Sequence, residues 1–371
     1  MTLLQHVSFA NRSPETGDWY ISAMPIPPLY GHEGIRHRLA GAIASGRLPQ
    51  ALLFEGPAGV GKQRLALWVA QGLLCEGTGE GEACGTCHSC KLVLNLSHPD
   101  VHWFVPVEPS RKGGDADKQV ELVEEALGEE MAARRQQPLY EPPSGLSSHG
   151  IAAVRLLLRR FVLTPAMGRR KVFVIGDAER LVPQTGAEAA ANALLKALEE
   201  PPADTTFILT TAVPESLLPT ILSRVVRVRV ARLADSIVAA FAQQELGVTG
   251  QRELAQRVAL ADGRIGRLLA GRDGSTRDAD AAERFLAGVD AGPARRYAVA
   301  LGVQPFQARG GFTDMLDALL ERLRERARVS GGTEKAVEAI ARVLEARGLA
   351  QGNVNPQLVA AVLADDLAEP A

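Results

Sequence analysis

The sequence predicts a parallel α/β domain followed by two helical domains. Three observations lead to this prediction. Between residues 24 and 230, short apolar runs alternate with helix-like segments, as in a parallel sheet whose strands are joined by crossover helices. A phosphate-binding loop pattern follows the first of these runs, and such loops connect a strand to a helix. From residue 231 onward, apolar residues recur at helical spacing.

The length and composition set broad limits. A chain of 371 residues is too long for one compact core, and 46% hydrophobic with 23% charged residues is ordinary for a globular protein. The formal charge of −2 gives no overall attraction to nucleic acids or membranes, so DNA contact would require a local basic patch.

The N-terminal residues 1–23 are polar and show no periodicity. We expect them to form a disordered arm, unless Met24 is the true start. They lack the basic start and apolar run of a signal peptide, and the chain has no apolar stretch of about 18 residues. The sequence therefore predicts a cytoplasmic protein that does not enter a membrane.

Residues 24–230 contain the elements of the predicted α/β domain. The five expected strands are Ala51–Phe54, Val101–Val105, Lys171–Ile175, Phe207–Thr211 and Val225–Val230. Polar residues at 108–148 interrupt this alternation, and we expect a surface insertion with one amphipathic helix through Val120, Val123, Leu127 and Met131. The acidic residues of this helix are more typical of a solvated face than of a partner site.

Two helical regions follow the α/β domain. Residues 231–285 place Ile237, Val238, Phe241 and Leu246 on one apolar face, which predicts a small helical domain. Residues 286–371 contain two apolar stripes at helical spacing: Phe312, Met315, Leu316, Leu319, Leu320 and Leu323, then Ala336, Ile340, Val343 and Leu344.

The phosphate-binding loop lies in Leu53-Phe-Glu-Gly-Pro-Ala-Gly-Val-Gly-Lys-Gln-Arg64. It matches G-x-x-x-x-G-K-[ST] at Gly56, Gly61 and Lys62, with an additional Gly59, but Gln63 replaces the hydroxyl residue. The pattern uses loop amides and Lys to hold phosphates, and the hydroxyl to ligate Mg²⁺. Because Mg²⁺ requires oxygen ligands at short distance, we expect a degenerate site in which nucleotide binding is doubtful.

All four cysteines, Cys75, Cys84, Cys87 and Cys90, occur with the spacing C-x₈-C-x₂-C-x₂-C. In a reducing cytoplasm, four thiolates at such spacing favour a structural tetrahedral zinc site over disulfides. Redox chemistry at one of the C-x-x-C pairs is the alternative, although a redox pair does not need four clustered cysteines. His88 is expected to be a bystander.

A second nucleotide signature is also altered. After the strand ending at Ile175, an active ATPase of the AAA+ class would place Asp-Glu, to position the metal and orient the attacking water. This chain has Gly176 and Asp177 at those positions. The loss of metal-site groups in both signatures predicts that the chain does not hydrolyse ATP.

The chain resembles the bacterial clamp-loader subunits of DNA polymerase III, and most closely their delta-prime branch. The resemblance covers about residues 29–270, with a weaker match near residues 353–358. It is most specific in Ala191-Asn-Ala-Leu-Leu-Lys-Ala-Leu-Glu-Glu-Pro-Pro202, Thr206-Phe-Ile-Leu-Thr-Thr211 and Leu218-Pro-Thr-Ile-Leu-Ser-Arg224.

This resemblance implies an AAA+ domain (24–230), a helical lid (231–285) and a helical collar for oligomerisation (286–371). It also implies a hetero-pentameric ring with delta and gamma/tau subunits that places a sliding clamp on primed DNA. The subunit would be a component of the DNA-directed DNA polymerase holoenzyme without activity of its own. The family's zinc ligands map onto the four cysteines (residues 75–90).

The family's Ser-Arg-Cys motif maps onto Ser223, Arg224 and Val225, so the resemblance implies that Arg224 is an arginine finger for a neighbouring ATP site. A guanidinium supplied in trans can stabilise charge on a transferring phosphoryl group. From the residues alone, a surface arginine paired with a carboxylate is the simpler interpretation. The motor subunits' second sensing arginine falls at Gly266, so a role for Arg267 is left open.

A basic cluster at Arg155, Arg159, Arg160, Arg169, Arg170 and Lys171 permits phosphate contacts in a ring interior, or a solvated face. Two other functions compete with the non-hydrolysing subunit. An active gamma/tau-type motor would need Thr or Ser at position 63 and Asp-Glu at 176–177. An unrelated AAA+ regulator is disfavoured by the specific strings quoted above.

Overall fold

The computed structural model describes residues 26–77, 81–107, 115–137, 147–181, 188–269, 275–303, 311–329, 334–351 and 354–368. The predicted N-terminal arm (1–23) and parts of the predicted insertion (108–114 and 138–146) lie outside these residues. The strands are β1 (Ala51–Glu55), β2 (Val101–Phe104), β3 (Lys171–Ile175), β4 (Thr205–Thr211) and β5 (Val226–Arg229).

The helices of the first part of the chain are α1 (Glu33–Ala44), α2 (Lys62–Leu74), α3 (His88–Leu94), α4 (Ala116–Gln136), α5 (Ile151–Phe161), α6 (Ala189–Glu199) and α7 (Pro219–Leu222), with short 3₁₀ turns η1 (Ala178–Leu181) and η2 (Pro214–Ser216). Those that follow are α8 (Asp235–Gln244), α9 (Gln251–Ala261), α10 (Ile265–Leu269), α11 (Ser275–Asp290), α12 (Pro293–Leu301), α13 (Gly311–Val329), α14 (Glu334–Gln351) and α15 (Pro356–Asp366).

The five strands form one parallel sheet in the order β2-β3-β4-β1-β5. Successive side chains alternate between its two faces: Leu53 packs with the α4–α7 side, whereas Leu52 and Phe54 pack with the α1–α3 side. Both faces are covered, which explains why the central strands are continuous apolar runs in the sequence. The predicted α/β fold and its five strands are therefore confirmed.

The helix expected within residues 108–148 contributes to the core as well as to the surface. In α4, Val120, Val123 and Leu127 are buried in the same core as the sheet and α5. At the rim of the same contact, the exposed Asp117 pairs with Arg159 of α5. The described part of the predicted insertion thus forms an outer helix packed on α5, because its apolar stripe needs a partner surface.

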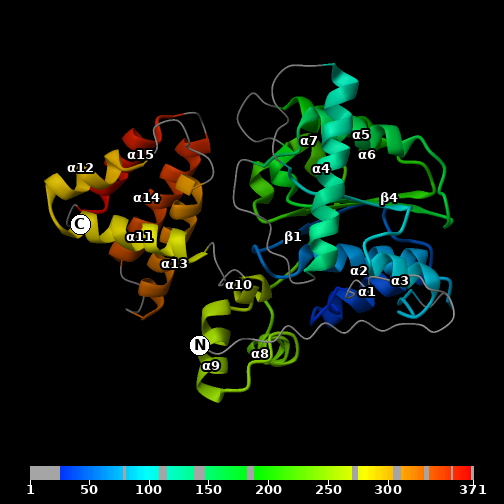
Figure 1. The fold of residues 1–371 in the computed structure, drawn as a ribbon, viewed down its shortest axis with the longest axis horizontal. Coiled ribbons are helices and arrows are strands. Elements are labelled where there is room, and N and C mark those ends of the chain that lie inside the picture. Colours follow the sequence, from blue (N-terminus) through cyan, green and yellow to red (C-terminus); the bar gives the residue numbers. More distant parts are fainter. Residues whose placement is uncertain are drawn as a thin grey trace, which may run out of the picture.

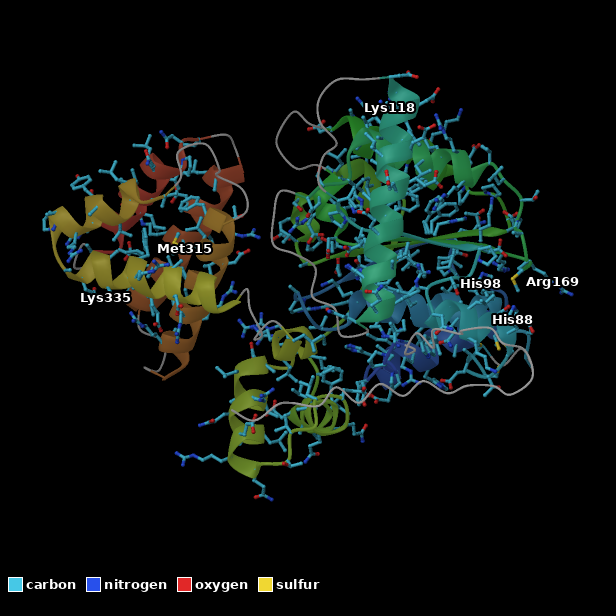
Figure 2. The ribbon with its side chains drawn as sticks, in the orientation of Figure 1. His88, His98, Lys118, Arg169, Met315 and Lys335 are labelled. Atoms are coloured by element: carbon cyan, nitrogen blue, oxygen red, sulfur yellow. The ribbon has the colours of Figure 1, made fainter. Side chains whose placement is uncertain are left out.

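The remaining helices form two further groups, each with its own hydrophobic core (Figure 1). Leu233, Val238 and Ala261 hold α8–α10 together. In α11–α15, the predicted stripe of α13 is buried, and Met315 lies inside this bundle (Figure 2). Leu344, assigned to the second stripe, is instead 47% exposed.

The expected boundary at residue 285 falls inside α11. Ala282 and Phe285 of this helix are buried in the core of the C-terminal bundle. We therefore propose that the second and third domains divide before α11. Among the helices of the described residues, none is long and apolar enough to span a membrane.

Candidate functional site

The candidate site lies at the carboxyl ends of β1, β3 and β4, which a parallel sheet brings to one edge. The loop after β1 ends at Gly61, which precedes α2 and has a positive φ of 97°; Gly59 has φ 81°. Residues other than glycine rarely adopt a positive φ, so both positions favour glycine. The loop thus has the strand–loop–helix setting that the sequence predicted, with the first amides of α2 facing the site.

Lys62 is folded back onto its own loop. Its side chain is buried, and Nζ donates hydrogen bonds to the carbonyl oxygens of Gly56 at 2.8 Å and Pro57 at 2.9 Å. Burial lowers the pKa of the ammonium, an effect that the carboxylates of Glu179 and Asp177 oppose. In an active site this ammonium group would face the β- and γ-phosphates; here it is hydrogen-bonded to carbonyl oxygens of its own loop.

Gln63 fills the space next to the second altered signature. A Cβ atom added to Gly176 would lie 2.9–3.0 Å from the amide group of Gln63. Nε2 of Gln63 donates a hydrogen bond to Oδ2 of Asp177 at 3.2 Å. The altered residues of the two nucleotide signatures are thus in contact, because the Gln63 amide occupies the space that a side chain at position 176 would fill.

This contact predicts that positions 63 and 176 are energetically coupled. Gly176→Asp should destabilise the chain by about 1–2 kcal/mol, since the new side chain displaces the Gln63 amide and adds a charge beside Asp177. Gln63→Thr in the same chain should relieve part of this cost. Urea unfolding of the two single variants and the double variant measures the coupling, expected to exceed about 0.5 kcal/mol. Additive effects would contradict the contact.

A second carboxylate, Glu179, lies partly buried near the loop. Glu179 accepts a hydrogen bond from the Ala212 N–H at 3.2 Å, and its other oxygen has no hydrogen-bond partner among the described residues. Burial raises its pKa, and the nearby Asp177 adds to that rise. The sequence analysis did not identify Glu179, because its partly buried position depends on tertiary packing.

Helix α10 touches the phosphate-binding loop directly. The Gly266 N–H donates to the carbonyl oxygen of Gly59 at 2.8 Å, and a Cβ atom on Gly266 would lie 2.6 Å from the Gly59 Cα. The position of the family's second sensing arginine therefore carries a backbone contact to the loop. Arg267, to which the sequence analysis assigned no sensing role, donates a hydrogen bond to the Leu260 carbonyl oxygen at 3.1 Å.

The four cysteines converge as predicted. Cys75 follows α2, Cys87 caps the start of α3, and all four sulfur atoms of Cys75, Cys84, Cys87 and Cys90 lie within 4.8 Å of one another. A tetrahedral zinc site with Zn–S bonds of about 2.3 Å has sulfurs about 3.8 Å apart. Sγ atoms of Cys84 and Cys90 are 4.0 Å apart, so the arrangement fits a metal ion after small adjustments.

The surroundings of Cys84 and Cys90 shift their thiol pKa values in opposite directions. The Cys87 N–H donates to Sγ of Cys84, and the Cys90 N–H donates to Sγ of Cys87. Hydrogen bonds from the Cys87 and Thr86 N–H groups lower the pKa of the Cys84 thiol to about 6. Burial raises the pKa of the Cys90 thiol, and a bound cation would counteract that rise.

Arg224 lies between α7 and the edge strand β5. Its side chain is 29% exposed and forms an ion pair with Glu199 at the end of α6. The following residue, Val225, replaces the family's cysteine and is buried in the main core. Within the isolated chain, Arg224 is therefore a surface arginine paired with a carboxylate, as the simpler interpretation predicts.

The basic cluster of the sequence is partly neutralised. Arg159 pairs with Asp117, and Arg160 pairs with Glu124 at 2.6 Å, both across the α4–α5 contact. These pairs give Arg159 and Arg160 protein partners, so a nucleic acid is not needed to account for the two arginines.

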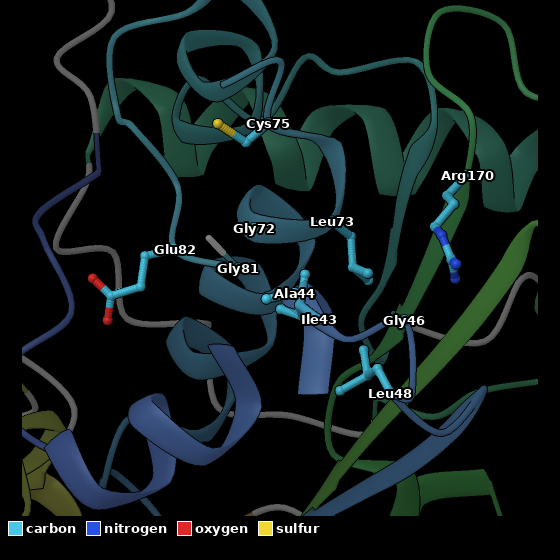
Figure 3. A pocket seen from close by; sticks show the side chains of 10 residues that line it. All are labelled: Ile43, Ala44, Gly46, Leu48, Gly72, Leu73, Cys75, Gly81, Glu82 and Arg170. Atoms are coloured by element: carbon cyan, nitrogen blue, oxygen red, sulfur yellow. The ribbon is translucent and has the colours of Figure 1, made fainter. Parts of the chain in front are cut away.

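One cavity of about 250 Å³ lies apart from the phosphate-binding loop (Figure 3). Ile43 and Ala44 of α1 contribute to its wall, together with Leu73 and Cys75 from the end of α2. The loop lies at the opposite end of α2, so this cavity is not part of the candidate nucleotide site.

Comparison with known proteins identifies relatives of this chain. The protein family described as DNA polymerase III, delta subunit, matches residues 31–234. The DNA polymerase III subunit delta′ of Yersinia pestis is 33% identical over 187 residues, which is 50% of this chain and 43% of that protein. The delta′ subunit of Pseudomonas aeruginosa is 36% identical over 178 residues, 48% of this chain and 42% of that protein.

A DNA polymerase III subunit tau from Salmonella typhimurium is 31% identical over 196 residues, which is 53% of this chain and 24% of that protein. The matches to the delta′ subunits thus span less than half the length of those relatives. Among solved structures, a gamma subunit-related protein from Thermotoga maritima overlaps 89% of this chain and 98% of its own, at 16% identity and a TM-score of 0.42. At this TM-score, the structural similarity carries no argument about mechanism.

Proposed function

The chain belongs to the DNA polymerase III delta-subunit family, and on that premise we propose that it is a delta-prime-type clamp-loader subunit that does not hydrolyse ATP. In this proposal it joins delta and gamma/tau subunits in a cytoplasmic hetero-pentameric ring that loads the sliding clamp onto primed DNA. One observation carries the non-hydrolysing assignment: the Gln63 amide fills the space at Gly176 and is bound to Asp177.

Three features support a site without turnover. A metal ion at this position would need the hydroxyl and carboxylate oxygens that Gln63 and Gly176 do not supply. Lys62 is held by loop carbonyl oxygens, so a phosphate would have to displace two hydrogen bonds. The contact of Gly266 with Gly59 places α10 against the loop. In this proposal the loop has a structural role, because it connects the sheet to α10 through the contact between Gly59 and Gly266.

The cysteine cluster has a structural role in this proposal. Cys75, Cys84, Cys87 and Cys90 would hold Zn²⁺, which, when bound, cross-links the end of α2 to the start of α3 and leaves no open position for a substrate. Redox chemistry is disfavoured because all four sulfurs converge on one point.

The active function proposed for this subunit is the donation of Arg224 to a neighbour. Arg224 lies beside the edge strand β5 with its side chain partly exposed, where another subunit can approach. An arginine supplied in trans would stabilise negative charge on the transferring phosphoryl group of a neighbouring ATP site. The chain's own altered loop offers it no reaction to serve.

An active gamma/tau-type motor is the second candidate, because a tau subunit is among the relatives. The residues at positions 63 and 176 oppose it, since Gln63 has no hydroxyl, Gly176 has no carboxylate, and the Gln63 amide occupies the space beside Gly176. Membership of the family also disfavours an unrelated AAA+ regulator.

We expect the purified chain alone to hydrolyse ATP at background rate, because both metal-positioning groups are absent. Gln63→Thr should not restore turnover, since Gly176 still lacks a carboxylate. The measurement is phosphate release with and without Lys62→Ala. Turnover by the unchanged chain that disappears in Lys62→Ala would overturn the assignment, whereas equal residual rates in both would indicate a contaminating ATPase.

A further inference from the structure

We propose that Glu199 is the positioning residue for Arg224: it holds one edge of the guanidinium so that the other edge can meet a phosphate in the neighbouring subunit. This inference rests on the proposed role of Arg224 in trans and adds a second residue to that role. Glu199 is the last residue of α6, within the string that makes the sequence resemblance most specific.

The two edges of the guanidinium have different partners. On one edge, Nε donates to Oε1 of Glu199 at 2.9 Å, and Nη2 binds the same oxygen. On the other edge, Nη1 donates to the Thr220 carbonyl oxygen at 2.8 Å and to the Ser223 hydroxyl at 3.3 Å. Hydrogen bonds between ionised groups are stronger than those to neutral acceptors.

This difference determines which contacts an incoming anion would replace. A phosphate oxygen competes easily with the neutral oxygens of Thr220 and Ser223, but less easily with the carboxylate of Glu199. The Nη1 edge is therefore exchangeable, whereas the Nε edge remains fixed to α6. A guanidinium fixed in this way loses little further rotamer freedom when it binds its target.

The exposure of the pair argues against a purely stabilising role. The Arg224 side chain is 29% exposed and that of Glu199 is 45% exposed, and ion pairs in such positions contribute little to folding. Exclusion of water by a neighbouring subunit would strengthen the same pair. The pair therefore has its largest effect in the assembled ring, where the orientation of Arg224 decides the rate.

The test uses the ring reconstituted with unchanged or variant subunit, and ATP turnover stimulated by clamp and primed DNA. The turnover removed by Arg224→Ala defines the Arg224-dependent part. Glu199→Ala should lower kcat of that part about tenfold with little change in KM for ATP, since misplacing a catalytic group affects the transition state. Glu199→Gln, which keeps the acceptor oxygen, should lie between the unchanged chain and Glu199→Ala.

Glu200→Ala is the matched control, because this neighbouring, exposed glutamate makes no hydrogen bond or ion pair to Arg224. A ring that contains Glu200→Ala should hydrolyse ATP at the same rate as a ring that contains the unchanged chain. Glu199→Ala combined with Arg224→Ala should equal Arg224→Ala alone, since Glu199 acts only through the arginine.

The outcomes separate the two proposals. Normal turnover in Glu199→Ala, with Arg224→Ala impaired, would overturn the positioning role alone. Faster turnover in Glu199→Ala would show that the carboxylate sequesters Arg224, which also overturns it. Normal turnover in Arg224→Ala would overturn the role in trans, and the positioning role with it.

Discussion

Replacing Arg224 by alanine is expected to slow one neighbouring ATP site in the assembled ring by about 10³–10⁵-fold while leaving this chain folded. The reason is that the guanidinium would act on charge that develops outside its own chain. The local cost is small, because the pair with Glu199 is partly exposed and such pairs contribute about 0–1 kcal/mol. The measurement is ATP turnover of the reconstituted ring, with assembly verified by gel filtration.

Arg227→Ala is the matched control for this prediction. Arg227 lies on β5 close to Arg224 in sequence and is also paired with a glutamate, Glu55. We expect this variant to assemble and to turn over ATP normally. If Arg224→Ala and the unchanged chain gave equal rates in equally assembled rings, Arg224 would be a surface residue.

Replacing Cys87 by alanine is expected to abolish stoichiometric zinc binding and to destabilise the segment between α2 and α3. Cys87 is one of the four converging thiols, and its sulfur also accepts the Cys90 N–H at the start of α3. Loss of a metal site is among the changes that cost more than about 3 kcal/mol. Metal analysis under reducing conditions and hydrogen exchange of residues 75–94 would measure both effects.

His88→Ala is the control for a substitution at the start of α3 that does not remove a thiol. His88 is the first residue of this helix and is not one of the clustered ligands, so its removal should leave one zinc per chain. An absence of zinc from the freshly prepared, unchanged chain would contradict the site, and retention of zinc by Cys87→Ala would remove Cys87 from it.

The strands and the cysteine cluster could be predicted from the sequence because their signals are local. Residues 51–54 and 172–175 are continuous apolar runs, and a strand covered on both faces requires such a run. Cys84, Cys87 and Cys90 lie close together in the chain, so a short turn brings them together.

The contacts that decide the state of the site could not be predicted, because they join distant segments. Gln63 and Asp177 are 114 residues apart, and Arg224 and Glu199 are 25 residues apart. The approach of Gly266 to Gly59 depends on the absence of side chains at both positions, which each glycine alone does not reveal. The burial of α4 on α5 likewise depends on tertiary packing, whereas its polar flanks favoured a surface insertion.

The most direct test compares Lys62→Ala and Arg224→Ala of this chain in the same reconstituted ring. Lys62 belongs to the chain's own phosphate-binding loop, whereas Arg224 is proposed to serve a neighbour. If this subunit donates an arginine and hydrolyses nothing itself, clamp- and DNA-stimulated ATP turnover should be unchanged by Lys62→Ala, whereas Arg224→Ala should remove the contribution of the neighbouring ATP site. Loss of turnover with Lys62→Ala and normal turnover with Arg224→Ala would contradict this and identify the chain as an active motor.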